Sequence, residues 1–422
     1  MIFDQDSWQE IISTLKKNKL RSLMTAFGVF WGIFMLMVML GTGTGLEHGV
    51  TQELSDRATN SVYIWTRKTS KPYQGFPRGR HYHFVNEDIE KIRRNIPGVE
   101  HLAPRNKLGS YRTTNNVVRK GKAGAFSIYG DYPAIQSILL QKITKGRFIN
   151  HLDLQEKRKV AVIGSRVYKI LFEKGDDPLG KYIQIRGVFF KVIGVFATNR
   201  SGDDEEEDTQ TIFIPFTTFQ HAFNYGNKVG WFAMTSEKGT SAAIVEEKVM
   251  ALLARNHHIA PDDKRAFGRW NAEIEHNKIM DVFFGVEALI WFVGISTLLA
   301  GVIGVSNIML IVVKERTREI GIRRALGAAP RSIIGQIMLE TISLTSIAGY
   351  AGLLAGVVMV EISSYFMAKG GIKMELFRNP EVDLNAATIA LLVLIISGAI
   401  AGLIPAHQAV NIKTVDAIRT EI

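Results

Sequence analysis

The chain has 422 residues, and a 46% hydrophobic content with a mean hydropathy of +0.07 is too high for an ordinary soluble protein that is also 22% charged. A formal net charge of +11 permits nucleic-acid binding, anionic-membrane binding or cytoplasmic loop charge, so the positions of the basic residues must decide among them. The absence of cysteine excludes structural disulfides, zinc sites with cysteine ligands, thiolate catalysis and a lipid-modified cysteine.

Residues 1–21 are predicted to form a cytoplasmic amphipathic helix that lies on the inner leaflet of a membrane. Apolar residues recur there at near-helical spacing, and basic residues crowd the later turns. The apolar set is Trp8, Ile11, Ile12, Leu15 and Leu20, and the basic set is Lys16, Lys17, Lys19 and Arg21.

Charge-free windows follow at 22–46, 288–313, 341–360 and 384–412. Each holds the roughly 20 residues that a helix needs to cross the hydrocarbon core, and each is apolar on all faces rather than along one stripe. This argues against buried helices of a soluble protein. A cleaved signal peptide is the alternative for the first window, but no A-x-A-like site follows it. We predict transmembrane helices at 22–46, 282–313, 332–360 and 384–406.

Glycines are frequent in these spans. The pairs Gly28/Gly32, Gly352/Gly356 and Gly398/Gly402 have the spacing that lets membrane helices approach closely, although glycine is simply common in such helices. Gly41, Gly43 and Gly45 are interpreted as a flexible exit from the first span.

Basic residues at the span ends orient the chain. They precede the first span, and the 314–331 connector holds six basic against two acidic residues, whereas the 361–383 loop holds three against four. This pattern predicts a cytoplasmic N-terminus, a cytoplasmic tail at 407–422 and an extracytoplasmic domain at 47–281. Three glutamates lie near span ends, where interfacial pairing is favoured over a proton relay. They are Glu287, Glu340 and Glu361.

The 47–281 domain reads as mixed α/β, because helical spacing with capping residues and short β-branched or aromatic runs both occur in it. Helices are predicted at 86–95 and 241–254, and strands at 160–163, 182–185, 189–196 and 211–214. The acidic run at 203–208 is interpreted as a solvated loop, with a calcium or cationic-partner site as the alternative.

Motifs for catalysis or cofactor binding are weak. Residues 175–181 have the spacing of a phosphate-binding loop, but Tyr182 replaces the hydroxyl residue that would hold magnesium. The histidine pairs lack a further ligand at suitable spacing, and no nucleophile is paired with a base. These pairs are His81 with His83 and His257 with His258. We expect no catalytic, cofactor-binding or metal-binding residue, and the chain is not expected to be an enzyme.

The 314–331 connector is the most informative segment. Ion-pair spacing, an apolar side and a glycine stop predict one ordered helix. The excess of basic residues that is common in cytoplasmic loops would not by itself require these features. The residues concerned are the pairs Glu315–Arg318 and Glu319–Arg323, the apolar Ile320, Ile322, Ala325 and Leu326, and the stop residues Gly327 and Pro330. We interpret this segment as a helix that docks in a groove of a cytoplasmic partner.

A family resemblance rests on this connector. The sequence ERTREIGIRRALGAAPRSII, followed by Glu340, resembles the cytoplasmic segment of MacB-like (FtsX-like) ABC transporter permeases. The resemblance covers nearly the whole chain: LKKNKLRSLMTAFGVFWG is similar to the family's first span, DPLGKYIQIRGVFFKVIGVF and TIFIPFTTFQ to its periplasmic core domain, and PAHQAVNIKTVDAIR to its closing segment. In that last segment His407 and Gln408 stand where basic residues are common.

The resemblance implies a four-helix membrane protein with a large mixed α/β extracytoplasmic domain between helices 1 and 2. An inserted β-rich lobe would lie at about 110–215, with 175–181 as a hairpin connection. The matching residues of the segment that meets the ATPase are Glu315, Arg316, Thr317, Arg318, Glu319, Gly321, Arg323, Arg324, Gly327 and Ala328. ATP and magnesium would be bound by a separate ABC ATPase subunit, and a second permease, identical or paralogous, would complete the transporter.

The resulting hypothesis is ATP-driven export of an extracytoplasmic substrate, a toxin, peptide, macrolide or lipoprotein, at a bacterial inner membrane. The family often adds a periplasmic adaptor and an outer-membrane channel. An alternative is an FtsX-like signalling or scaffold subunit that activates a cell-wall hydrolase. An ion-coupled secondary transporter ranks last, because no inverted repeat or broken helix is visible.

Overall fold

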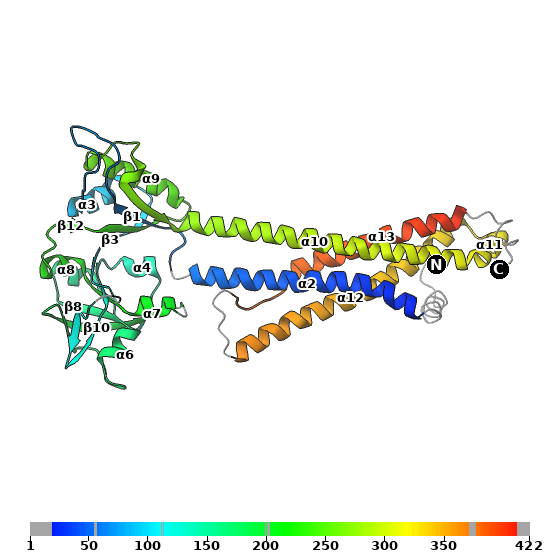
Figure 1. Cartoon of the computed structure of the whole chain (residues 1–422), viewed down its shortest axis with the longest axis horizontal. Coiled ribbons are helices and arrows are strands. Elements are labelled where there is room, and N and C mark those ends of the chain that lie inside the picture. The colour runs from blue at the N-terminus through cyan, green and yellow to red at the C-terminus, as the bar shows by residue number, and fades with distance from the viewer. Residues whose placement is uncertain are drawn as a thin grey trace. The chain divides into compact units, whose positions relative to one another are not determined.

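The computed structural model describes residues 19–54, 57–110, 112, 114–198, 200, 203–370 and 377–411. The chain divides into two compact units, a helical unit of Met1–Val50 with Asp281–Ile422 and an α/β unit of Thr51–Met280. Figure 1 shows both. Residues 1–18 of the amphipathic helix expected at 1–21 lie outside the described residues. Residues 412–422 of the expected tail also lie outside them.

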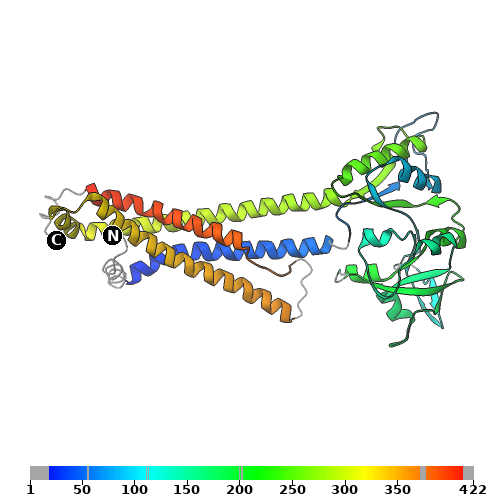
Figure 2. The same ribbon diagram turned by 180° about the vertical axis from the view of Figure 1, so that it is seen from behind.

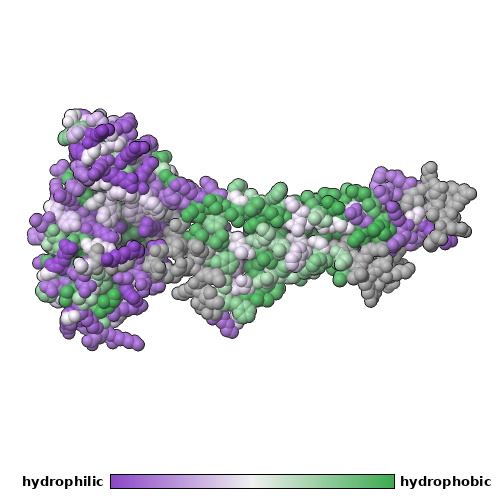
Figure 3. Space-filling model, in the orientation of Figure 1, coloured by the Kyte–Doolittle hydropathy of each residue, from purple (hydrophilic) through white to green (hydrophobic). Residues whose placement is uncertain are grey.

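The helical unit is built from long helices and one short one. They are α2 (Lys19–Leu54), α10 (Ala272–Glu315), α11 (Thr317–Ala325), α12 (Pro330–Gly370) and α13 (Leu384–Asn411). Within the described chain, the four long helices are apolar enough to cross a membrane, as the sequence predicts. Figures 1 and 2 show α13 alongside α12, with which it makes many contacts, and Figure 3 shows apolar residues gathered over these helices.

The helices extend beyond the predicted spans. Helix α10 has 44 residues, which at about 1.5 Å per residue makes it about 66 Å long, twice the thickness of a hydrocarbon core. A hydropathy window detects only the part of a helix that suits lipid. The polar turns that begin α10 at Ala272 continue the same helix without contributing to that window.

Glycines set how closely these helices pack. A Cβ built on Gly301 of α10 would lie 3.1 Å from the carbonyl carbon of Gly28 in α2, and one on Gly352 of α12 would overlap the carbonyl oxygen of Phe30. A Cβ on Gly398 of α13 would overlap the side-chain hydroxyl of Thr345 in α12. Helices in lipid gain no hydrophobic driving force by packing together, so close packing at small residues supplies the attraction between them.

The flexible exit expected at Gly41, Gly43 and Gly45 is wrong, because α2 runs unbroken through all three. A Cβ on Gly41 would lie 2.6 Å from a methyl carbon of Val360, and one on Gly45 would lie 2.8 Å from the ring of Phe377. These two glycines are packing positions.

The α/β unit is centred on a 12-stranded sheet in the part of the chain that the structure describes. Its order is β14-β1-β13-β3-β6-β11-β8-β10-β9-β4-β5, with β7 paired to β10. The strands are β1 (Ser61–Thr66), β3 (Val99–Leu108), β4 (Val117–Arg119), β5 (Lys122–Gly124), β6 (Ser127–Asp131), β7 (Lys142–Gly146), β8 (Val160–Gly164), β9 (Tyr182–Ile185), β10 (Val188–Ala197), β11 (Thr211–Pro215), β13 (Trp231–Ser236) and β14 (Phe267–Asn271); β2 (Phe84–Val85) pairs separately with β12 (Lys228–Val229).

Helices cover both faces of this sheet. They are α3 (Asn86–Asn95), α4 (Ile135–Leu139), α5 (His151–Gln155), α6 (Ser165–Leu171), α7 (Asp203–Thr209), α8 (Phe216–Ala222), α9 (Ala242–Asn256) and the 3₁₀ turn η1 (Lys264–Ala266). Alternate residues of β1 face opposite sides. Val62 and Ile64 belong to the core that contains α3 and α9, whereas Tyr63 belongs to the core that contains α4.

The helices predicted at 86–95 and 241–254 form as α3 and as α9, which Ser241 caps. The four predicted strands form as β8, β9, β10 and β11. The lobe expected at about 110–215 shares one sheet with its flanks, because β3 pairs with both β13 and β6.

The acidic run at 203–208 is not a loop. It forms helix α7. Glu206 pairs with Arg166 at 3.2 Å and Asp208 with Arg200 at 3.4 Å, so neighbouring arginines offset its charge.

Residues 175–181 are not a hairpin connection either, since they join α6 to β9. The hairpin turn of this region lies at Arg186 and Gly187, which link Ile185 of β9 to Val188 of β10. Both residues have positive φ, as a two-residue turn of this kind requires. Lys181 forms an ion pair with Asp176, which engages the one lysine of the apparent phosphate motif.

Candidate functional site

The predicted docking helix at 314–331 is three pieces rather than one. Lys314 and Glu315 end α10, α11 occupies Thr317–Ala325, and Pro330 already begins α12. Arg316 lies between α10 and α11 with φ −93° and ψ 11°. Because Arg316 interrupts the helix, Glu315 and Arg318 do not share one helix, whereas Glu319 and Arg323 do and pair at 2.8 Å.

The stop predicted at Gly327 is confirmed. Gly327 has φ +94°, the left-handed conformation that glycine adopts without steric cost. The N–H of Gly327 donates to the carbonyl of Arg324 at 3.1 Å, and the N–H of Ala328 donates to that of Arg323 at 3.0 Å. This pair of hydrogen bonds is the Schellman motif, which satisfies the last carbonyls of α11.

One face of α11 packs into the helical unit. Ile320 is buried with Val313 of α10 and with Ile333 and Ile337 of α12. A cavity of about 30 Å³ remains beside them, and the side chains of Arg316 and Glu340 also line it.

Three arginines tie the segment to the long helices. Arg316 pairs with Glu340 of α12 at 3.2 Å. Arg323 donates to the amide oxygen of Gln336 of α12 at 2.8 Å, and Arg324 donates to the carbonyl of Val410 at 2.5 Å, one residue before α13 ends. A guanidinium at that position satisfies a terminal carbonyl and interacts favourably with the helix dipole.

The opposite face of α11 carries apolar side chains at the surface. Ile322 is 45% exposed and Leu326 is 84% exposed, and Arg318 and Ala325 are exposed beside them. The single apolar side expected from the sequence is therefore divided, because Ile320 packs inward while Ile322 and Leu326 do not. This exposed set, Arg318, Ile322, Ala325 and Leu326, is called the outer face of α11 below.

The ten predicted coupling residues fall into three places. Glu315 and Arg316 precede α11; Thr317, Arg318, Glu319, Gly321, Arg323 and Arg324 lie in it; Gly327 and Ala328 follow it. Sequence reasoning assigned no role in this segment to Gln336 or to the carbonyl of Val410. Among the residues that contact this segment from α12 and α13, only Glu340 could be recognised in the sequence, as a charge at the border of an apolar window.

His257, from one of the two histidine pairs, contacts a carboxylate that caps a helix. Nε2 of His257 lies 2.6 Å from Oδ2 of Asp88, which also accepts from the N–H of Val85 at 2.9 Å and so caps α3. Burial would raise the pKa of Asp88, but hydrogen bonds from His257, Val85 and Asn256 outweigh it and hold that pKa below its ordinary value. Among the described residues, no group of three or more histidines and carboxylates could hold a metal ion.

Two family models match the chain. Residues 22–252 match the MacB-like periplasmic core domain, and residues 291–414 match the FtsX-like permease C-terminal domain. The chain belongs to the family of MacB-like ABC exporter permeases. In this MacB-like permease, the mixed α/β domain follows the first of four candidate membrane helices and precedes the second, as in a multi-pass membrane protein.

Relatives of this MacB-like permease carry export names. It is 28% identical over 411 residues to the pyoverdine export ATP-binding/permease protein PvdT of Pseudomonas putida. That alignment covers 96% of this chain and 58% of PvdT. It is 28% identical over 432 residues to the macrolide export ATP-binding/permease protein MacB of Chlorobium luteolum, covering 99% and 60%. The chain thus spans about three fifths of the length of these relatives. Their names do not favour the signalling alternative.

A solved structure is also similar. The periplasmic region of MacB from Actinobacillus actinomycetemcomitans aligns with 54% of this chain and 95% of its own length, with 18% identity and a TM-score of 0.42.

Proposed function

We propose that this permease exports a substrate by transmitting movement from an ABC ATPase that docks on the outer face of α11. The observation that carries the proposal is a short helix with an exposed apolar face whose other side is held to three long helices. Ile322 and Leu326 supply that face. Exposed apolar side chains beside charges are typical of the anchors that fill a partner's groove.

The contacts behind that face give a route for transmission. A force on α11 acts on α12 through Arg323 and Gln336, and on α13 through Arg324 and Val410. The Arg316–Glu340 pair joins the end of α10 to α12. Because α11 has only nine residues, a displacement of its outer face reaches all of these contacts.

The proposal includes the partners that the family implies. ATP and magnesium are bound by the ATPase, which is a separate subunit, and a second permease completes the pair. The chain resides in a bacterial inner membrane with α11 and both termini in the cytoplasm and the α/β unit in the periplasm, where an adaptor leads to an outer-membrane channel. The cargo is a toxin, peptide, macrolide or lipoprotein.

Substitution of Leu326 tests the docking surface. We expect Leu326→Asp to lower recovery of the ATPase with the tagged permease, and the stimulation of ATP hydrolysis, by about tenfold, because it places a charge at the centre of an apolar contact. Leu384→Asp is a matched control, because Leu384 is 80% exposed at the start of α13. Equal recovery with both variants would contradict docking on α11.

A second variant separates docking from transmission. Glu319→Ala combined with Arg323→Ala removes the Glu319–Arg323 pair and the hydrogen bond from Arg323 to Gln336 of α12, and it leaves Ile322 and Leu326 in place. We expect the ATPase to be recovered and to hydrolyse ATP while movement of the α/β unit is reduced rather than abolished, because the contacts from Arg324 to Val410 and from Arg316 to Glu340 remain. The chain has no cysteine, so Lys248→Cys on exposed α9 provides a unique site for a fluorescent dye. An ATP-dependent change in its emission at full amplitude in the double variant would contradict transmission through Arg323.

A further inference from the structure

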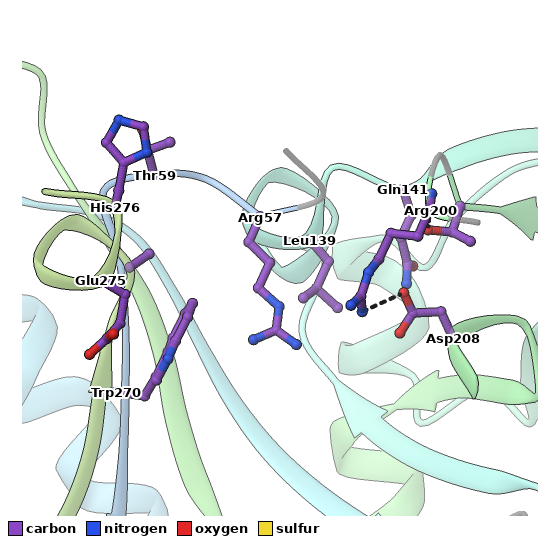
Figure 4. A pocket seen from close by; sticks show the side chains of 11 residues that line it. Arg57, Thr59, Leu139, Gln141, Arg200, Asp208, Trp270, Glu275 and His276 are labelled. Atoms are coloured by element: carbon purple, nitrogen blue, oxygen red, sulfur yellow. Dashed lines mark hydrogen bonds and ion pairs between the residues drawn. The ribbon is translucent and has the colours of Figure 1, made fainter. Parts of the chain in front are cut away.

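The α/β unit contains a cavity of about 180 Å³, formed by segments far apart in the sequence (Figure 4). Arg57 follows α2 and Gln141 precedes β7. Arg200 precedes α7 and Asp208 lies in it, while Trp270 lies in β14 and His276 in α10. All of these residues belong to the α/β unit itself.

Two buried polar atoms in the walls of this cavity have no hydrogen-bond partner among the residues that the structure describes. They are Oε1 of Gln141 and Nδ1 of His276. Most buried polar atoms in native proteins are satisfied, so an unsatisfied pair lining one cavity points to a partner that binds there. Nδ1 of His276 can donate to an oxygen of such a partner, whereas Oε1 of Gln141 only accepts and takes a hydroxyl, an N–H or a bridging water.

The charged residues around the cavity indicate which charge that partner carries. Asp208 pairs with Arg200 at 3.4 Å, and Glu275 pairs with Lys278 at 2.9 Å, so both acidic side chains of the wall are offset by a base. Arg57 has no ion pair with a described carboxylate. Its guanidinium lies instead over the rings of Trp270, 5.0 Å from the centroid, and Tyr63, 5.7 Å from the centroid. Figure 4 shows Arg57 between the Arg200–Asp208 pair and Trp270.

The remaining walls are apolar. Leu139, Trp270 and Ala272 line the cavity beside the polar groups. A planar guanidinium held over an aromatic ring binds carboxylate or phosphate oxygens through paired hydrogen bonds, and the apolar walls suit a short hydrocarbon portion.

We propose that this cavity binds an anionic head group, a carboxylate or a phosphate, that carries an apolar portion, with Arg57 as its principal contact. The site goes beyond the transport function proposed above and does not rest on ATPase docking. The ligand is either the acid group of a soluble molecule or the head group of an anionic phospholipid. Both offer the same oxygens to Arg57.

Calorimetric titration of the full chain in a neutral maltoside detergent tests the site. The probes are hexanoate and hexyl phosphate, with hexylammonium and hexanol as matched probes of opposite or no charge. We expect saturable binding of the two anions and none of the others. Arg57→Gln lowers anion affinity at least tenfold and Arg57→Lys lowers it less, because lysine keeps the charge but not the planar fork.

Arg67→Gln provides the matched control. Arg67 is exposed and lies over the ring of Trp65, 6.0 Å from the centroid, outside the cavity. We expect it to bind hexanoate as the unmodified chain does. Equal affinity in Arg57→Gln and the unmodified chain, or binding of hexanol as tight as that of hexanoate, would overturn the proposal and leave a water-filled cavity.

A second arm identifies the source of the ligand. The chain is placed in nanodiscs of phosphatidylcholine with or without phosphatidylglycerol, and hexanoate is titrated again. Weaker hexanoate binding in the presence of phosphatidylglycerol supports the site and assigns it to a lipid head group. Unchanged binding supports the site and assigns it to a soluble anion.

Discussion

Nη1 of Arg316 lies 3.2 Å from Oε2 of Glu340, across 24 positions of sequence. The Glu340 side chain is 7% exposed and that of Arg316 is 26% exposed, so the carboxylate is the more deeply enclosed partner. An ionised carboxylate is stable among apolar helices only if a cation accompanies it. The pair therefore fixes the junction of α10 and α11 against α12.

Removal of one partner tests this relationship. We expect Glu340→Ala and Arg316→Ala each to lower the free energy of unfolding, by about 3 kcal/mol for Arg316→Ala, which removes a paired cation from a buried carboxylate. The double variant should lose clearly less than the sum of the two. The measurement is a double-mutant cycle on the thermal unfolding of the full chain in detergent, and additive losses would show that the pair contributes nothing as a unit.

Two glycines of α12 provide a comparison of packing. A Cβ on Gly352 overlaps the carbonyl oxygen of Phe30 in α2, whereas one on Gly335 meets no atom within 4 Å. We expect Gly352→Ala to destabilise the chain by about 1 to 3 kcal/mol, since α2 must move away. Gly335→Ala should be neutral or stabilising, because alanine favours the helix. Equal unfolding midpoints for the two variants would contradict the close contact between α2 and α12.

The end of α11 depends on the left-handed conformation of Gly327. We expect Gly327→Ala to cost about 1 kcal/mol or more, because an L-residue with a Cβ is strained there. Gly327→Asn should recover part of the loss, since asparagine tolerates positive φ. Stability and ATPase stimulation measured on the same samples check whether the Schellman motif positions α11, and similar values for Ala and Asn would count against it.

Asp153 makes the α/β unit sensitive to acid. Its buried carboxylate accepts from Arg147 at 2.6 and 3.0 Å and from the N–H of Asn150 at 3.0 Å. Burial raises the pKa of Asp153, but the hydrogen bonds from Arg147 and Asn150 and the nearby charge of Arg158 outweigh it, so the pKa lies below its ordinary value of 3.8. The folded state therefore keeps this group ionised at a pH where the unfolded chain is protonated.

The stabilisation from Asp153 is consequently present above about pH 4 and is lost as the pH falls through the lower pKa of the folded state. We expect Asp153→Asn to unfold at a lower temperature than the unmodified chain at pH 7, corresponding to about 2 kcal/mol, and the difference to shrink as the pH approaches 3. Glu100→Gln, on an exposed side chain of β3, is the control. A difference that stays constant from pH 7 to pH 3 would contradict the assignment.

The sequence by itself determined the four spans, because lipid demands about 20 apolar residues with every backbone group paired inside the helix. It also located the end of α11 at Gly327, the helix at 86–95 and the strand of 160–163, because turns, caps and periodicity depend on residues that are neighbours in sequence. A resemblance to known permeases extended this to the family.

Only the tertiary structure decided which side of α11 faces outward. Ile320 and Ile322 are alike in sequence terms, and the packing of α10 and α12 against α11 buries the first and leaves the second exposed. It likewise brought Arg324 to Val410, 86 positions away, and turned the acidic run at 203–208 into a helix beside Arg166 and Arg200. These outcomes depend on the distance between side chains that are remote in sequence. Local periodicity carries no information about that distance, which is set when the helices and the sheet pack.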